Sequence, residues 1–170
     1  MPVEVPGCTV RRARTGDVRA IRALVDAYAA DRRLLSKATV TLYEDLQEFW
    51  VAERDGQVLG CGALHVMWED LAEVRTVAVA EQAHGQGIGS SLLRRLVEHA
   101  RELGVRRLFC LTFETGFFAR HGFVPVDEVP VELTVQAELL RSPDEGVAEF
   151  LDLERVKPNT LSNTRMLALL

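Results

Sequence analysis

Hydrophobic residues recur every three or four positions in three segments, which predicts three amphipathic helices. The segments are residues 15–28, 41–49 and 88–103. Thr15 is the expected N-cap of the first helix, and Thr41 and Glu44 have the spacing of a capping box in the second. Gly104 directly follows the third segment and is expected to end that helix.

Other segments are short, rich in β-branched and apolar residues, and bounded by turn residues, which is typical of strands. They are residues 10–14, 50–54, 57–68, 71–80, 105–113 and 165–170. Asp55 and Gly56 join two of these segments, and this dipeptide predicts a tight hairpin. Strands and helices thus intermingle along the chain, which predicts an α+β (mixed α/β) fold.

The length of 170 residues and the 48% hydrophobic content predict one domain, residues 1–170, with a sizeable core. No apolar run approaches the roughly 20 residues of a membrane span, and the N-terminus lacks a basic start followed by an apolar block. We therefore expect a cytoplasmic chain without membrane contact. The net charge of −5 does not favour nucleic acid as a partner.

Neither the cysteines nor the histidines have the spacing of metal ligands, so no metal is expected. Cys110 lies in the apolar run LFCLTF, which favours a buried core thiol over a reactive nucleophile.

Three glycines, Gly85, Gly87 and Gly89, lie between a predicted strand and a predicted helix. A glycine-rich turn at a helix N-terminus presents unpaired N–H groups and favours an anion such as phosphate. The dinucleotide fingerprint needs the spacing G-x-G-x-x-G and a later acidic residue, and the P-loop needs Gly-Lys-Ser/Thr. This sequence has neither, and a glycine turn without a ligand is the remaining alternative from the glycines alone.

The segment QAHGQGIG resembles the Q/R-x-x-G-x-G/A motif of the GNAT superfamily of N-acetyltransferases, and FFARHGF resembles that family's F-Y-x-x-x-G-F segment. The resemblance implies a GNAT-type fold, with a mostly antiparallel mixed sheet that is splayed in the middle and flanked by helices. It also implies acetyl-CoA as co-substrate. The residues implied to bind it are Val77 and Val79 along the pantetheine arm, and Gln82, His84, Gly85, Gln86, Gly87, Ile88, Gly89 and Ser90 around the pyrophosphate.

Longer blocks are similar to the acetyltransferase domain of N-acetylglutamate synthases, notably the short actinobacterial kind, over nearly the whole chain. This resemblance implies transfer of acetyl to the α-amine of glutamate or glutamine, which opens arginine biosynthesis. Dimers are common in that family, so a homodimer is a further expectation. The alternatives are an acetyltransferase for another small amine or a protein N-terminus, and a non-catalytic acetyl-CoA sensor.

Acetyl transfer to an ammonium group requires a base, and many members of the superfamily carry a glutamate where this chain has Glu73. A strand N–H near Val77 would stabilise the oxyanion. Lys37 and Arg75 are the candidate cations for the substrate carboxylate; Arg75 is two residues after Glu73 and should share its sheet face. Phe118 replaces the tyrosine that often protonates the departing thiolate, so the sequence does not identify the general acid.

Overall fold

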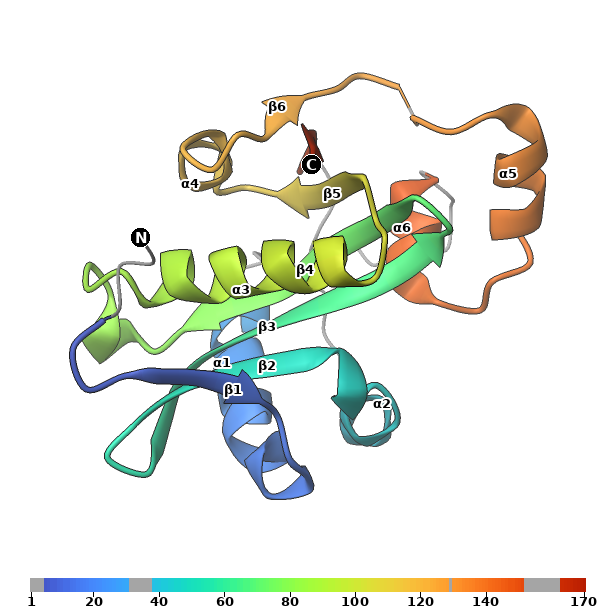
Figure 1. Ribbon diagram of the computed structural model, residues 1–170. Helices are drawn as coiled ribbons and strands as arrows, with labels where there is room; N and C mark the ends of the chain where they lie inside the picture. Colours follow the sequence, from blue (N-terminus) through green and yellow to red (C-terminus); the bar gives the residue numbers. More distant parts are fainter. Residues whose placement is uncertain (1–4, 31–37, 129, 152–162) are drawn as a thin grey trace.

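A seven-stranded sheet organises residues 5–30, 38–128, 130–151 and 163–170, which the computed structural model describes (Figure 1). Its strands are β1 (Thr9–Arg12), β2 (Phe49–Arg54), β3 (Gln57–Trp68), β4 (Leu71–Val79), β5 (Arg107–Thr112), β6 (Val124–Pro125) and β7 (Thr164–Leu169). They are ordered β1-β2-β3-β4-β5-β7-β6, and each neighbouring pair is antiparallel except β4 and β5. The expected mixed, mostly antiparallel sheet is confirmed.

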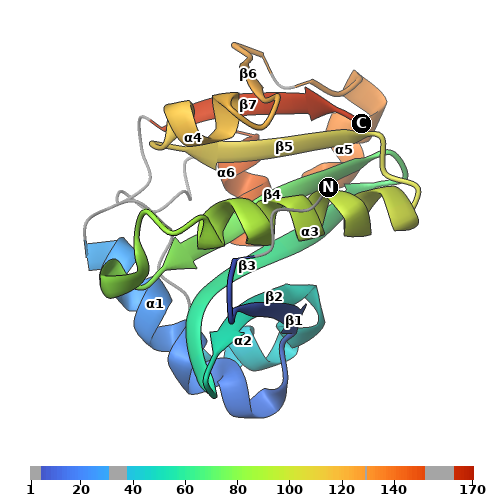
Figure 2. The ribbon, with the colours of Figure 1, turned by 60° about the vertical axis from the view of Figure 1, so that its left-hand side comes forward.

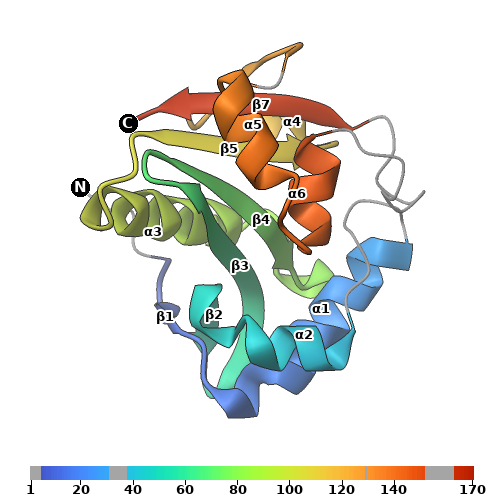
Figure 3. The ribbon, with the colours of Figure 1, turned by 90° about the vertical axis from the view of Figure 1, so that its right-hand side faces the viewer.

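Helices cover both faces of this sheet (Figure 3). They are α1 (Val18–Ala30), α2 (Thr39–Glu44), α3 (Ile88–Glu102), α4 (Thr115–Ala119), α5 (Leu133–Leu139) and α6 (Glu145–Phe150). Apolar side chains of α3 and α4 form the main core on one face, with Leu92, Leu96 and Phe118 buried among strand residues. On the other face α1 and α2 cover one part of the sheet, and α5 and α6 cover another.

The hairpin and the third helix lie where the sequence predicts them. Asp55 and Gly56 join β2 to β3, and both have positive φ, 50° and 76°, as the tight turn requires. Helix α3 ends before Gly104, which has φ 90°.

The predicted helix over residues 41–49 is wrong in its bounds and its cap. Helix α2 covers Thr39–Glu44 after Ala38, a short 3₁₀ turn follows at Leu46–Glu48, and no capping box forms around Thr41. Phe49 instead begins β2, where it pairs with Ala63 and is buried. Pairing and burial on the sheet therefore override the helical spacing of Phe49.

Thr15 does not cap α1 directly. It begins a 3₁₀ turn, Thr15–Asp17, and α1 starts at Val18. The turn is held by the carboxylate of Asp17, which accepts a hydrogen bond from the N–H of Arg14 at 2.7 Å and pairs with Arg11. The turn that precedes α1 is thus stabilised by the side chain of Asp17 rather than by the hydroxyl of Thr15.

Strands β4 and β5 separate soon after they meet, as Figure 2 shows. They pair in parallel only from Leu71↔Arg107 to Glu73↔Phe109, although β4 continues to Val79 and β5 to Thr112. This is the splay in the middle of the sheet that the family resemblance implies.

Helix α6 is fastened to β4 by an ion pair. The carboxylate of Asp144, the N-cap of α6, accepts two hydrogen bonds of 2.9 Å from the terminal nitrogens of Arg75, and it also accepts one from the N–H of Val147. Gly146 leaves room for the guanidinium, since a Cβ at that position would lie 2.5 Å from Arg75 Nη2. Burial alone raises the pKa of Asp144, but its bonds and charge interaction with Arg75 outweigh burial and hold the pKa well below the usual range.

We predict that Asp144→Asn lowers the free energy of unfolding at pH 7 by roughly 1.5–3 kcal/mol, the value of a hydrogen bond to a charged group. Because the folded-state pKa of Asp144 is lowered, this stabilisation is complete above the unfolded-state pKa of about 3.9 and is lost as the pH falls below it. Urea unfolding at pH 7 and pH 3 should therefore show a smaller difference between wild type and variant at pH 3.

The control for this prediction is Asp26→Asn, because Asp26 forms an exposed ion pair with Arg22 on α1. That change should cost less than about 0.5 kcal/mol at either pH. Equal losses from Asp144→Asn at both pH values would show that its charge does not hold α6 on the sheet.

Candidate functional site

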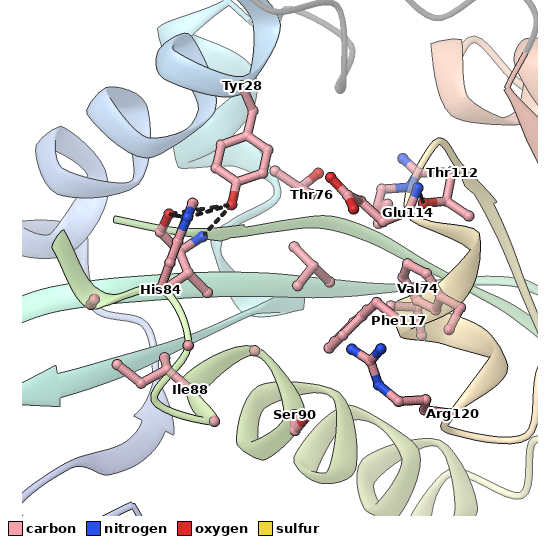
Figure 4. Close-up of a pocket in the computed structure, with 18 of the residues that line it drawn as sticks. Tyr28, Val74, Thr76, His84, Ile88, Ser90, Thr112, Glu114, Phe117 and Arg120 are labelled. Atoms are coloured by element: carbon pink, nitrogen blue, oxygen red, sulfur yellow. Dashed lines mark hydrogen bonds between the residues drawn. The ribbon is translucent and has the colours of Figure 1, made fainter. Parts of the chain in front are cut away.

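A pocket of about 510 Å³ lies where β4 and β5 have separated (Figure 4). Its lining comes from α1, β4, the loop before α3, α3 itself, β5 and α4: Tyr28, Val74, Arg75, Thr76, Val77, Val79, Ala83, His84, Gly85, Gly87, Ile88, Gly89, Ser90, Leu111, Thr112, Glu114, Phe117, Phe118 and Arg120. The glycine segment and the two diverging strands therefore enclose one space.

The loop at residues 84–87, here called the glycine turn, leads from a 3₁₀ turn into α3. Gly85 and Gly87 have φ of 78° and 84°, a region that side chains with a Cβ rarely adopt. Gly87 is the N-cap of α3, and no side chain caps it, so the first N–H groups of a 15-residue helix are directed to the pocket end of α3. These N–H groups and the helix dipole suit a phosphate group.

Basic side chains and a hydroxyl lie beside this helix end. Ser90 Oγ lies 3.0 Å from His121 Nε2, and the ring of His121 contacts Phe117. Burial, with smaller contributions from the charges of Arg94 and Arg120, lowers the pKa of His121, so its ring is neutral at pH 7. Arg120 reaches the pocket from the end of α4 and adds a positive charge to it.

The middle of β4 carries a β-bulge. Cys61 pairs with Ala78 and Ala63 with Arg75, so that Thr76 and Val77 lie opposite Gly62 alone. Thr76 is buried and has φ 59°, an unusual conformation for a β-branched residue. Such strain is typical of functional sites, and it redirects the backbone of β4 where Val77 faces the pocket.

Glu73 and Arg75 share one face of β4, as their spacing predicts. Arg75 Nε donates a 2.9 Å hydrogen bond to Glu73 Oε1, and its terminal nitrogens are bonded to Asp144. Burial alone lowers the pKa of Arg75, but the charges of Glu73 and Asp144 raise it overall, so the guanidinium stays charged. Arg75 lines the pocket while its hydrogen-bonding nitrogens are held by two carboxylates; Glu73 is buried and does not line the pocket.

The remaining predicted site residues fall into three groups. Val77, Val79, His84, Gly85, Gly87, Ile88, Gly89 and Ser90 line the pocket. Gln82 and Gln86 do not, and Gln86 instead accepts a 2.8 Å hydrogen bond from Arg54. Lys37 lies outside the described residues.

Several polar residues of the pocket were not predicted from the sequence, among them Tyr28, Thr112 and Glu114. Tyr28 has the helical spacing of the buried face of α1, so its periodicity indicates core packing. Thr112 ends β5 and Glu114 follows it as the N-cap of α4; the Thr112 hydroxyl accepts a 2.8 Å hydrogen bond from the N–H of Glu114. For Thr112 and Glu114, the only signal in the sequence is their position at the carboxyl end of a strand that is parallel to its neighbour, which is where such sheets bind ligands.

Two predictions about apolar positions agree with the structure. Phe118 is buried against Phe117 and Phe123 and brings no hydroxyl to the pocket. Cys110 is buried, and this burial, with the charge of Glu73 adding to it, raises the pKa of its thiol, so it is no nucleophile at neutral pH.

Within the described ranges, no group of three or more His, Cys, Asp or Glu residues is placed to bind a metal ion. None of the helices described there has the length and apolarity needed to cross a membrane.

Comparison with known proteins agrees with this geometry. Residues 19–123 match the acetyltransferase (GNAT) family. An amino-acid acetyltransferase from Mycobacterium tuberculosis is 58% identical over 95% of this chain and 94% of its own length. The crystal structure of Rv2747 from the same organism, in complex with CoA and NLQ, superposes with a TM-score of 0.91 at 58% identity and covers 95% of this chain and 99% of its own.

The N-acetylglutamate synthase of Neisseria gonorrhoeae, complexed with coenzyme A and N-acetyl-glutamate, superposes with a TM-score of 0.76 at 27% identity. The match covers 96% of this chain but only 35% of that larger protein. The family match, the near-full-length relative and the splayed sheet agree: the chain belongs to the acetyltransferase (GNAT) family.

Proposed function

We propose that this protein is an amino-acid N-acetyltransferase that moves an acetyl group from acetyl-CoA to the α-amine of glutamate or glutamine. The observation that carries the proposal is the continuous pocket from the N-terminus of α3 to the ion-paired face of β4. One end suits a diphosphate and the other lies beside the carboxylates that Arg75 holds, those of buried Glu73 and half-buried Asp144. The 58%-identical amino-acid acetyltransferase of M. tuberculosis supports the same reaction class.

In this proposal the glycine turn and the first turn of α3 hold the pyrophosphate of acetyl-CoA. The open edge of β4 at Val77 and Val79 orients the pantetheine arm, because a strand edge offers N–H and C=O groups in an extended row. Acetyl-CoA supplies an activated thioester. The N–H of Val77, redirected by the bulge at Thr76, is the donor proposed for the oxyanion.

Glu73 is the proposed base, and it takes a proton from the substrate ammonium directly or through water. Glu114 is the alternative candidate for the base, because it lines the pocket and Glu73 does not. Arg75, already bonded to two carboxylates, is proposed to orient Glu73 more than to bind the substrate. Lys37 remains the proposed partner of the substrate carboxylate.

The proposed reaction predicts a narrow amino-acid preference. Steady-state release of the CoA thiol, measured with each of the twenty amino acids, should give glutamate or glutamine a kcat/KM at least about tenfold above the others. Turnover of a different amine would favour another acetyltransferase activity. Binding of CoA with no turnover on any amine would favour a sensor.

Gly87→Val should weaken binding of acetyl-CoA at least tenfold, which is about 1.4 kcal/mol, when measured by calorimetry. Valine disfavours the positive φ of this position and places a branched side chain at the helix end proposed to hold the diphosphate. Gly56→Val is the matched control, because Gly56 has a similar φ of 76° but lies in the β2–β3 hairpin. If both variants fold and bind CoA like wild type, the phosphate site is not at the glycine turn.

Glu73→Gln should lower kcat by about 10²–10⁴ at neutral pH, because glutamine keeps the size of the side chain but cannot accept the proton. The loss should shrink as the pH approaches the pKa of the substrate amine, where free amine is abundant. Glu114→Gln is measured in parallel, and its pH–rate profile should resemble that of wild type. The reverse result, a large loss with Glu114→Gln and a small one with Glu73→Gln, would make Glu114 the base.

A further inference from the structure

The backbone of Val79 faces the gap between β4 and β5. The N–H of the next residue, Ala80, donates a 2.8 Å hydrogen bond to the carbonyl of Leu59, so the backbone groups of Ala80 are directed to the β3 side. Along a strand these groups alternate in direction, so the N–H and C=O of Val79 are directed away from β3. Strand β5 no longer pairs with β4 at this level, because their pairing stops at Glu73.

Two side chains supply the partners that β5 does not (Figure 4). Tyr28 Oη, from the last turns of α1, accepts a 3.2 Å hydrogen bond from the N–H of Val79. His84 Nε2, from the glycine turn, lies 2.8 Å from the carbonyl oxygen of Val79, and Tyr28 Oη lies 3.3 Å from the same oxygen. The two side chains also meet each other, with Tyr28 Oη 3.2 Å from His84 Nε2.

The hydrogen-bond chemistry of this group, here called the Tyr28–His84 clasp, is self-consistent. The carbonyl of Val79 can only accept, which assigns the proton to His84 Nε2. The hydroxyl of Tyr28 both accepts from the N–H of Val79 and has a proton to donate. Together the two side chains therefore offer Val79 an acceptor and a donor, as an amide group of an adjacent strand would.

We propose that the Tyr28–His84 clasp is a gate for the pantetheine arm: it pairs with Val79 in the ligand-free protein, and the Tyr28 hydroxyl must leave before an amide of the ligand can pair there. The inference rests on the proposed function, which directs the pantetheine arm along Val77 and Val79. Part of the binding free energy of the ligand is then used to break the hydrogen bond between Tyr28 and Val79. A ligand that binds at the glycine turn but does not reach the backbone of Val79 leaves the hydrogen bond between Tyr28 and Val79 in place.

The test compares binding of two ligands to wild type and to Tyr28→Phe by calorimetry. CoA reaches Val79, whereas adenosine 3′,5′-bisphosphate has no pantetheine arm. A hydrogen bond between neutral groups contributes a small net free energy, so Tyr28→Phe should bind CoA about two- to tenfold more tightly and adenosine 3′,5′-bisphosphate with unchanged affinity. Tyr43→Phe is the control, because Tyr43 is the other tyrosine of the chain and is exposed on α2.

A second measurement follows the clasp itself. Amide hydrogen exchange at Val79 in the ligand-free protein should be about two- to tenfold faster in Tyr28→Phe than in wild type or Tyr43→Phe, because the hydroxyl no longer protects this N–H. This readout does not depend on activity or on added CoA.

The outcomes separate the gate from the proposed function. Unchanged or weaker CoA binding by Tyr28→Phe would overturn the gate, and weaker binding would mean that the hydroxyl itself holds the ligand. Tighter binding of both ligands would also overturn it, since the smaller one does not reach Val79. A wild-type protein that binds no CoA would refute the proposed function instead.

Discussion

The site depends on the short pairing of β4 with β5. Parallel strands that pair over only three residues and then separate leave a row of backbone groups without a neighbouring strand. Buried or half-buried backbone groups require partners, and here they come from side chains of α1 and the glycine turn, or in our proposal from the ligand. The bulge at Thr76 occurs on the same stretch and further redirects β4 toward the gap.

The charged groups differ between the two ends of the pocket. At the α3 end, the N–H groups of the first helical turn and the charge of Arg120 favour an anion. At the other end Glu73 and Asp144 share the single guanidinium of Arg75. This arrangement attaches the segment that contains α6 to the strand that carries the proposed base, so packing of the C-terminal part of the chain and the chemistry are coupled through one ion pair.

Local sequence signals predicted the elements whose structure depends on local chemistry. The Asp55–Gly56 hairpin, helix α3 and the glycine turn all follow from backbone preferences of a few adjacent residues. The helix predicted up to Phe49 failed at its end because Phe49 pairs with Ala63 of β3, a partner that periodicity alone does not reveal. Helices α5 and α6 are short, and their weak periodicity gave no prediction for the segment that contacts Arg75.

By itself, the sequence determined the mixed α+β fold, the glycine turn at Gly85 and Gly87, and the shared face of Glu73 and Arg75, since these follow from the residue types and their spacing along the chain. Only the tertiary structure decided what these groups touch. It brings Asp144 into contact with Arg75, 69 residues away in the sequence, and Tyr28 into contact with Val79, 51 residues away. Such contacts arise from the packing of separate elements on the sheet, and the spacing of residues along the chain does not encode which distant side chain fills a given gap.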